Sequence, residues 1–184
     1  NEGVELVNIV RSQQQVDILA AMGAKYICNS SDADFAQKLT DALDATGATI
    51  AFDATGGGDL ANTILGCMER ALSKNAKGLN TYGSVELKQV YLYGGLDVGP
   101  TLLKRGYGMS WSVGGWLMPL SLARIGMERT GELRQKVADE LKTTFASAYT
   151  DELSLVEALD PKQIARYLPK KTGEKYVVTA QKDA

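Results

Sequence analysis

The sequence contains no histidine and only two cysteines, Cys28 and Cys67, among its 184 residues. Without histidine, the chain cannot form a Ser-His or Cys-His nucleophile pair from its own residues. Zinc sites almost always use cysteine or histidine ligands, and two cysteines far apart in sequence make a poor ligand set. These absences argue against a hydrolase or a catalytic zinc site within this chain, so we expect no bound metal.

Long apolar runs and concentrations of basic residues are also missing. No apolar run approaches the ~18 residues that a membrane-spanning helix needs, and no segment resembles a secretory signal. The formal net charge is −2 with scattered basic residues, whereas a nucleic-acid partner usually needs a concentrated basic face. The two cysteines lie in apolar stretches that we expect to be buried, which favours a reduced, cytoplasmic setting. No membrane or nucleic-acid partner is therefore expected.

What the sequence does contain is an alternation of short β-rich runs with helical patterns. Strands are predicted at about 5–10, 25–28, 48–53 and 88–93, and amphipathic helices separate them. Such alternation is typical of right-handed βαβ units and a parallel sheet. The predicted fold class is therefore α/β, with a Rossmann-like doubly wound sheet.

After residue 95 the alternation weakens. One more strand is predicted around 108–113, helices are predicted at 117–126 and 128–144, and a strand is predicted near 147–153. Pro161 directly after Asp160 predicts a helix start, and the last strand is predicted at 175–179. Residues 74–86 are polar and predict a loop.

Ligands of doubly wound sheets bind at the carboxyl ends of the strands. At the first such end, Arg11-Ser12 stands where an acidic residue usually binds the ribose of NAD, and arginine there instead suits the 2′-phosphate of NADP. An ordinary solvent-exposed arginine is the alternative interpretation. Gly56-Gly57-Gly58, which follows the third strand, predicts either a phosphate-binding turn or a tight link into the next helix.

The glycine fingerprint of dinucleotide-binding folds is missing. It should lie between the first strand and the first helix, before the strand that ends at Arg11, yet only Asn1-Glu2-Gly3 precedes that strand. The predicted sheet therefore lacks its first strand and its pyrophosphate-binding turn.

Three segments resemble the medium-chain dehydrogenase/reductase superfamily, and most closely its zinc-free, NADPH-dependent quinone oxidoreductase and enoyl reductase branch. They are Val10-Arg11-Ser12, the stretch from Met22 to Asn29, and the stretch from Ile50 to Gly57. The closing stretch from Thr172 to Thr179 is similar to the terminal strand of those enzymes, which returns to the catalytic domain. Unlike many relatives, this chain has Gln15 in place of a lysine and Ser30 in place of a tyrosine.

The resemblance implies an NADPH-dependent reductase of a quinone or activated alkene, with a small-molecule electron acceptor. It divides the chain into a truncated dinucleotide-binding domain, residues 1–145, and a segment that completes an absent catalytic domain, residues 146–184. The implied NADP(H)-binding residues are Arg11 and Ser12 at the 2′-phosphate, Thr55 and Gly56 along the ribose and pyrophosphate, and Tyr93, Gly94 and Gly95 at the nicotinamide. No catalytic residue is assigned, and the chain by itself is expected to be inactive.

The same resemblance implies a homodimer that pairs through the strand near 108–113, with Trp111 or Trp116 partly buried there. For both tryptophans, core packing or dimer contact is favoured over direct contact with the ligand, although the segment around Ser110-Trp111 is implied to contribute to the nicotinamide side. Two further functions stay open at the level of sequence. One is a methyltransferase-like domain that binds S-adenosylmethionine, which Arg11 disfavours, and the other is a nucleotide-sensing domain without chemistry.

Overall fold

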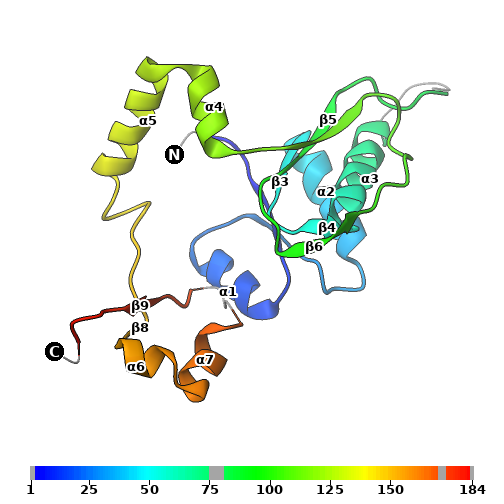
Figure 1. The fold of residues 1–184 in the computed structure, drawn as a ribbon. Helices are drawn as coiled ribbons and strands as arrows, with labels where there is room; N and C mark the ends of the chain where they lie inside the picture. Colours follow the sequence, from blue (N-terminus) through cyan, green and yellow to red (C-terminus); the bar gives the residue numbers. More distant parts are fainter. Residues whose placement is uncertain (1–2, 75–80, 170–172, 183–184) are drawn as a thin grey trace. The chain divides into compact units, whose positions relative to one another are not determined.

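The computed structural model describes residues 3–74, 81–169 and 173–182, and the chain forms two compact units, residues 1–121 and 122–184. Figure 1 traces the chain through both. Of the predicted polar loop at 74–86, residues 75–80 lie outside the described residues. Within the described ranges, no helix is long and apolar enough to cross a membrane.

The first unit begins with a β–α–β segment. Strand β1 (Val7–Val10) pairs in parallel with β2 (Tyr26–Asn29), and helix α1 (Gln13–Ala21) connects them. Ser12 caps α1, because its hydroxyl accepts a hydrogen bond from the Gln15 N–H. Helix α1 contains no buried residue, and no β1 residue is fully buried. This segment is therefore packed only lightly.

A second sheet lies farther along the chain. Its strands are β3 (Ile50–Asp53), β5 (Lys88–Leu92) and β7 (Trp111–Gly115), in the order β3-β5-β7 and all parallel. The predicted parallel α/β fold is confirmed, and the four strands expected before residue 95 are all present. The sheet is split, however: among the described residues, β1 pairs only with β2, and β3 pairs only with β5. The break falls between β1 and β3, where a first strand would lie in the 3-2-1-4-5-6 order of this fold.

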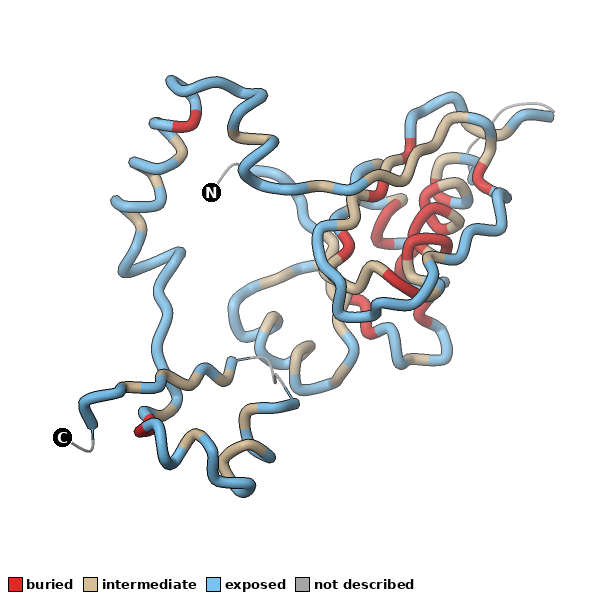
Figure 2. The backbone as a smooth tube through the Cα atoms, in the orientation of Figure 1, coloured by how far each residue is buried: buried red, intermediate tan, exposed pale blue. Residues whose placement is uncertain are grey.

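Helices α2 (Phe35–Thr46) and α3 (Leu60–Ser73) contain most of the core, which Figure 2 shows in red. Apolar residues recur on one face of each helix at three- and four-residue spacing, so each helix buries that face. Both cysteines belong to this core, as expected from their apolar surroundings. Its fully enclosed members include Leu39, Leu65, Cys67, Met68 and Val90.

A buried ion pair connects α3 to β5. The Lys88 side chain is fully buried, and its Nζ lies 2.8 Å from Oε2 of Glu69. Ser84 donates its hydroxyl and its backbone N–H to the same carboxylate. Burial alone would raise the pKa of Glu69, but the hydrogen bonds from Lys88 and Ser84 outweigh it and lower the pKa to about 2. Glu69 is therefore ionised throughout the physiological pH range.

The glycine triplet forms a strand that the sequence did not predict. Strand β4 (Gly56–Gly58) pairs in parallel with β6 (Asp97–Thr101), and the Thr101 hydroxyl donates to the Gly56 carbonyl over 2.7 Å. A Cβ on Gly57 would lie 2.7 Å from the Asp97 carboxylate. Side-chain-free residues are thus required here for the close approach of β6, which gives the triplet a packing role.

The second unit is mainly helical. Helix α4 (Met118–Ile125) spans the boundary between the units, and α5 (Met127–Asp139) ends five residues before the predicted position. Strand β8 (Asp151–Leu153), helix α6 (Leu155–Ala158), helix α7 (Pro161–Tyr167) and strand β9 (Tyr176–Val178) follow. Helix α7 starts at Pro161 as predicted, with the Asp160 carboxylate accepting from the Lys162 N–H. Strand β9 pairs in parallel with β8. Assignment of residues 146–184 to a catalytic domain stays a prediction.

Candidate functional site

Arg11 and Ser12 lie directly after β1, at its carboxyl end. The Arg11 residue is exposed, and no described residue is hydrogen-bonded or ion-paired to its guanidinium. Its backbone is fixed instead: the N–H donates to Gln15 Oε1 over 3.0 Å, and the carbonyl accepts from the Ser31 hydroxyl over 2.8 Å. The result is a cation with a held backbone and a solvent-facing side chain.

Ser31 is a neighbour of Arg11 that sequence reasoning missed. It follows β2, and its backbone N–H donates to the Asn29 side chain over 3.1 Å. Parallel pairing of β1 with β2 places the carboxyl ends of both strands at one sheet edge, and this places Ser31 beside Arg11. The sequence contained a signal for this, since Ser30 and Ser31 follow shortly after the strand predicted at 25–28. The carboxyl end of a parallel strand lies at that edge of the sheet. Gln15, noted only as a departure from relatives, positions the Arg11 backbone.

A second cluster lies at the carboxyl ends of β3 and β5. The Asp97 N–H donates to the Thr55 carbonyl over 2.9 Å, and the Tyr93 N–H donates to the Asp53 carbonyl over 3.0 Å. A Cβ on Gly94 would lie only 2.1 Å from the Ala54 carbonyl oxygen, so the two loops cross in direct backbone contact. The structure thus brings four of the sequence-predicted residues together: Thr55, Gly56, Tyr93 and Gly94.

Tyr93, Gly94 and Gly95 are the exposed members of this cluster. A Cβ on Gly95 would meet nothing within 4 Å. Tyr93 is 52% exposed, and its ring meets Phe52 and Trp116 edge-on at centroid distances of 6.5 Å. Trp116 is half-buried against this group, and Trp111 is half-buried against Tyr107. Trp111 packs against the core, whereas Trp116 contacts the exposed rings of Phe52 and Tyr93. Burial of either tryptophan at a dimer interface stays a prediction.

Asp53 ends β3 and is 2% exposed. Its Oδ1 accepts the Thr55 N–H over 2.7 Å and the Gly56 N–H over 3.4 Å, which shapes the turn into β4. Its Oδ2 is buried with no hydrogen-bond partner among the described residues. Buried carboxylate oxygens are normally satisfied, so this atom indicates a missing donor.

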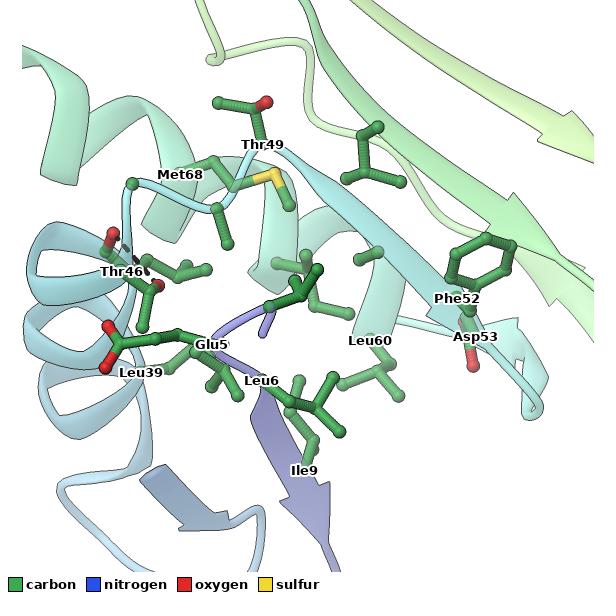
Figure 3. A pocket seen from close by; sticks show the side chains of 18 of the residues that line it. Glu5, Leu6, Ile9, Leu39, Thr46, Thr49, Phe52, Asp53, Leu60 and Met68 are labelled. Atoms are coloured by element: carbon green, nitrogen blue, oxygen red, sulfur yellow. Dashed lines mark hydrogen bonds between the residues drawn. The ribbon is translucent and has the colours of Figure 1, made fainter. Parts of the chain in front are cut away.

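A cleft of about 660 Å³ separates β1 from β3. Ile9 and Leu6 border it on one side, Phe52 and Asp53 border it on the other, and Leu60 lines it from α3 (Figure 3). Thr55 and Tyr93 also line it, so the cleft reaches the second cluster. Its lining is mainly apolar. Of the predicted site residues, Thr55 and Tyr93 therefore line this cavity, whereas Arg11 and Ser12 do not.

Other chemically reactive groups are few in this part of the molecule. Burial raises the pKa of both Cys28 and Cys67, so neither is a ready thiolate near neutral pH. The described residues contain no group of three or more His, Cys, Asp or Glu arranged to hold a metal ion. The candidate site thus contains an exposed arginine, hydroxyls, glycines and apolar walls.

Solved structures of reductases share this fold. A Mesorhizobium loti protein described as an NADPH:quinone reductase is 21% identical with a TM-score of 0.70, over 96% of this chain and 46% of that chain. The CurK enoyl reductase is 14% identical with a TM-score of 0.57, over 96% and 48%. A mutant Etr1p in complex with NADP and crotonyl-CoA is 16% identical with a TM-score of 0.55, over 94% and 46%.

These likenesses confirm the expected fold. The chain spans slightly less than half the length of each of these proteins. No protein-family model matches the sequence, and a search of curated proteins gives no match.

Proposed function

We propose that this chain is the NADPH-binding portion of an oxidoreductase that reduces a quinone or an activated alkene in the complete protein. The observation that carries the proposal is the exposed guanidinium of Arg11 at the carboxyl end of β1, which has no hydrogen-bond or ion-pair partner among the described residues. Two of the structural neighbours are named as an NADPH:quinone reductase and as an Etr1p mutant bound to NADP. These names support the choice of cofactor.

The end of β1 has the chemistry that a 2′-phosphate requires. Guanidinium offers a planar, permanently charged set of donors that matches phosphate oxygens. The Ser12 hydroxyl lies at the N-terminus of α1, where the helix dipole also favours an anion. Ser31, hydrogen-bonded to the Arg11 carbonyl, adds a further hydroxyl oxygen to this edge. We assign the 2′-phosphate to Arg11 and Ser12, with Ser31 as an additional contact.

The ends of β3 and β5 would hold the remainder of the dinucleotide. Thr55 and Gly56 provide a hydroxyl and a side-chain-free backbone for the ribose and pyrophosphate, and Gly94 and Gly95 let a flat ring approach the backbone. The Tyr93 ring would border the nicotinamide from one side. When bound, the cofactor supplies the hydride, and this chain's residues bind and orient it.

Titrations with fragments of the cofactor test this assignment. We expect 2′,5′-ADP to bind more tightly than 5′-AMP in isothermal titration calorimetry, because the two differ by the phosphate that Arg11 would hold. S-adenosylmethionine is the comparison ligand for the methyltransferase alternative. Equal affinity for 2′,5′-ADP and 5′-AMP, or binding of S-adenosylmethionine alone, would refute the proposal.

A further inference from the structure

A second cavity, of about 310 Å³, lies along helix α3 and is called the α3 cavity below. Asn62, Thr63, Gly66 and Arg70 line it and recur at the three- and four-residue spacing of one helix face. Further lining comes from the start of α2 and from the loop between β6 and β7. None of the residues assigned to the cofactor belongs to its lining. Its volume is at the lower end of the range for small-molecule pockets, roughly 300–1,000 Å³.

Two cations without a carboxylate partner line the α3 cavity. The Arg70 guanidinium is held by uncharged groups, since Nε donates to the Thr40 hydroxyl over 3.3 Å and Nη2 donates to Cys67 Sγ over 2.9 Å. Its Nη1 has no partner in the part of the chain that the structure describes. The Lys104 backbone N–H donates to Asn62 Oδ1 over 3.1 Å, whereas the Lys104 ammonium pairs with no described residue. A fixed guanidinium and a free ammonium thus favour an anion here.

Asp59 lines the cavity at the N-terminal end of α3. Its Oδ1 accepts from the Asn62 amide and its Oδ2 accepts from the Thr63 hydroxyl, each over 3.0 Å. Asn62 is itself fixed, because its Oδ1 accepts from the buried Tyr107 hydroxyl. No described cation pairs with Asp59, and a carboxylate oxygen can accept more than one hydrogen bond. This end of the cavity therefore has acceptor capacity for a ligand that donates.

Gly66 lies between these two ends and leaves the cavity wall without a side chain. Glycine in a helix interior costs about 1 kcal/mol relative to alanine. A Cβ there would meet only Arg70 Nη1, at an ordinary contact distance of 3.6 Å, so close packing does not require the glycine. What the glycine provides is space. The guanidinium lies next to Gly66, and seven residues separate Gly66 from Asp59, which corresponds to about 10 Å of helix rise.

We propose that the α3 cavity binds a small phosphorylated polyol of the size of a pentose phosphate. Its phosphate accepts from Arg70 and Lys104, because a doubly charged anion matches two cations at one end. Its hydroxyl groups donate to Asp59 at the other end. A ligand with an anion at both ends is disfavoured, since its second charge would lie against the Asp59 carboxylate. The inference shares no residue with the proposed cofactor site and stands apart from it.

Calorimetric titration of the full chain, in the absence of nucleotide, tests this inference. The probes are ribose 5-phosphate, inorganic phosphate and ribose. Ribose 5-phosphate is expected to bind saturably with a one-to-one stoichiometry. Inorganic phosphate should bind at least about tenfold more weakly, and ribose more weakly still, because each makes contacts at only one end of the cavity. Absence of saturable binding, or equal affinity for inorganic phosphate and ribose 5-phosphate, overturns the inference.

A pair of charge-removing variants tests the position of the phosphate. Arg70→Gln should weaken the binding of ribose 5-phosphate at least about tenfold, because it removes the charged donor. Lys74→Gln is the matched control, since Lys74 follows α3, lies outside the cavity and already pairs with Asp44 over 2.8 Å. It should leave the affinity unchanged. Equal weakening by both variants would show a general effect of charge and would overturn the inference.

Gly66→Leu tests the cavity without removing any charge. Leucine is a good helix former, and its side chain would occupy the space that the glycine leaves. The variant should bind ribose 5-phosphate at least about tenfold more weakly while its melting temperature does not fall, a combination that loss of structure cannot produce. Unaltered binding by Gly66→Leu would place the ligand outside the cavity. Loss of binding in Arg11→Ala would place it at the end of β1, and either result overturns the inference.

Discussion

Arg11 would decide between the two nicotinamide cofactors in the proposed site. NADPH and NADH differ only by the 2′-phosphate, which carries nearly two negative charges near neutral pH. Arg11→Ala is expected to weaken NADPH binding by roughly tenfold and to leave NADH binding nearly unchanged. This is the lower end of the loss of affinity expected when a hydrogen bond to a charged group is removed. The lower end applies because Arg11 is exposed and Gln15 provides no second cation. The measurement is the ratio of the two dissociation constants.

Two controls distinguish a direct contact between Arg11 and the 2′-phosphate from a general loss of positive charge: the salt dependence of binding and a matched lysine variant. The NADPH preference should decline as ionic strength rises, because an exposed ion pair is screened. Lys25→Ala removes one positive charge just before β2, at the opposite end of that strand, and should leave the ratio unaltered. If Arg11→Ala weakens both cofactors equally, Arg11 supports the fold and does not contact the phosphate.

Loss of the buried Lys88 should cost substantial stability. Lys88→Met leaves the Glu69 carboxylate without its cation, and breaking a buried pair in this way typically costs ~3–5 kcal/mol of unfolding free energy. Because the folded-state pKa of Glu69 is lowered to about 2 from 4.5, its contribution is fully present above pH ~5 and is lost as the pH falls toward 2. The difference in unfolding free energy between the wild type and Lys88→Met should therefore become smaller as the pH falls.

Urea denaturation of both proteins at neutral pH and at progressively lower pH measures this difference in unfolding free energy. The comparison variant is Lys25→Met, which breaks the exposed Lys25–Glu5 pair and should change stability little. A Lys88→Met effect that stays constant from neutral to acid pH would show that lost packing, and not the charge on Glu69, is responsible.

At the scale of elements, the crossing of the two glycine-containing loops is the tightest contact of the candidate site. Gly94→Ala would place a methyl group 2.1 Å from the Ala54 carbonyl oxygen, whereas the same change at Gly95 meets nothing within 4 Å. We expect Gly94→Ala to lower the unfolding free energy by about 1–3 kcal/mol, and Gly95→Ala to change it by less than about 0.5 kcal/mol. Thermal denaturation of the adjacent variants provides the comparison, and equal melting temperatures would contradict the crossing.

The strands were the most predictable elements, and glycine-rich segments were the least. β1, β2, β3 and β5 follow from compact β-rich runs between helical patterns, since hydrophobic periodicity survives in local sequence. β4 and β6 lack that signal, because Gly56–Gly58 and Val98-Gly99-Pro100 contain few side chains that report a buried face. Their pairing depends on a contact between segments about forty residues apart, which local patterns do not encode.

The candidate site, like the fold, could be predicted from the sequence only in part. Arg11, Thr55 and Tyr93 could be placed at strand ends from the sequence, because the strands could be located and the carboxyl ends of parallel strands share an edge; their roles in binding stay a prediction. Ser31 and the unsatisfied oxygen of Asp53 were missed, since hydrogen bonding by one particular atom depends on the three-dimensional arrangement. The cleft itself appeared in the sequence only as an expected missing strand.

At the scale of the whole molecule, β7 offers an edge for pairing with a second copy. Ser110 and Trp116 direct backbone groups toward β5, so the groups of Trp111, Val113 and Gly115 face the other side. We expect a homodimer in sedimentation equilibrium that Gly115→Pro weakens, because proline lacks the N–H. Gly115→Ala keeps that N–H, finds nothing within 4 Å, and should dimerise normally. A monomer at every concentration would exclude this interface.

The light packing of β1 and α1 has a consequence for how the molecule opens. Neither element contains a fully buried residue, so their amide protons should exchange with deuterated water through local openings of low free energy. This exchange should be far faster than exchange of the amide proton of Val90, which is fully buried in β5. Arg11 and Ser12 belong to this labile segment, so a ligand bound there stabilises it by mass action. Hydrogen exchange with and without 2′,5′-ADP should show slowing confined to the β1–α1–β2 segment, so that the nucleotide makes one of the least protected parts of the chain more resistant to exchange.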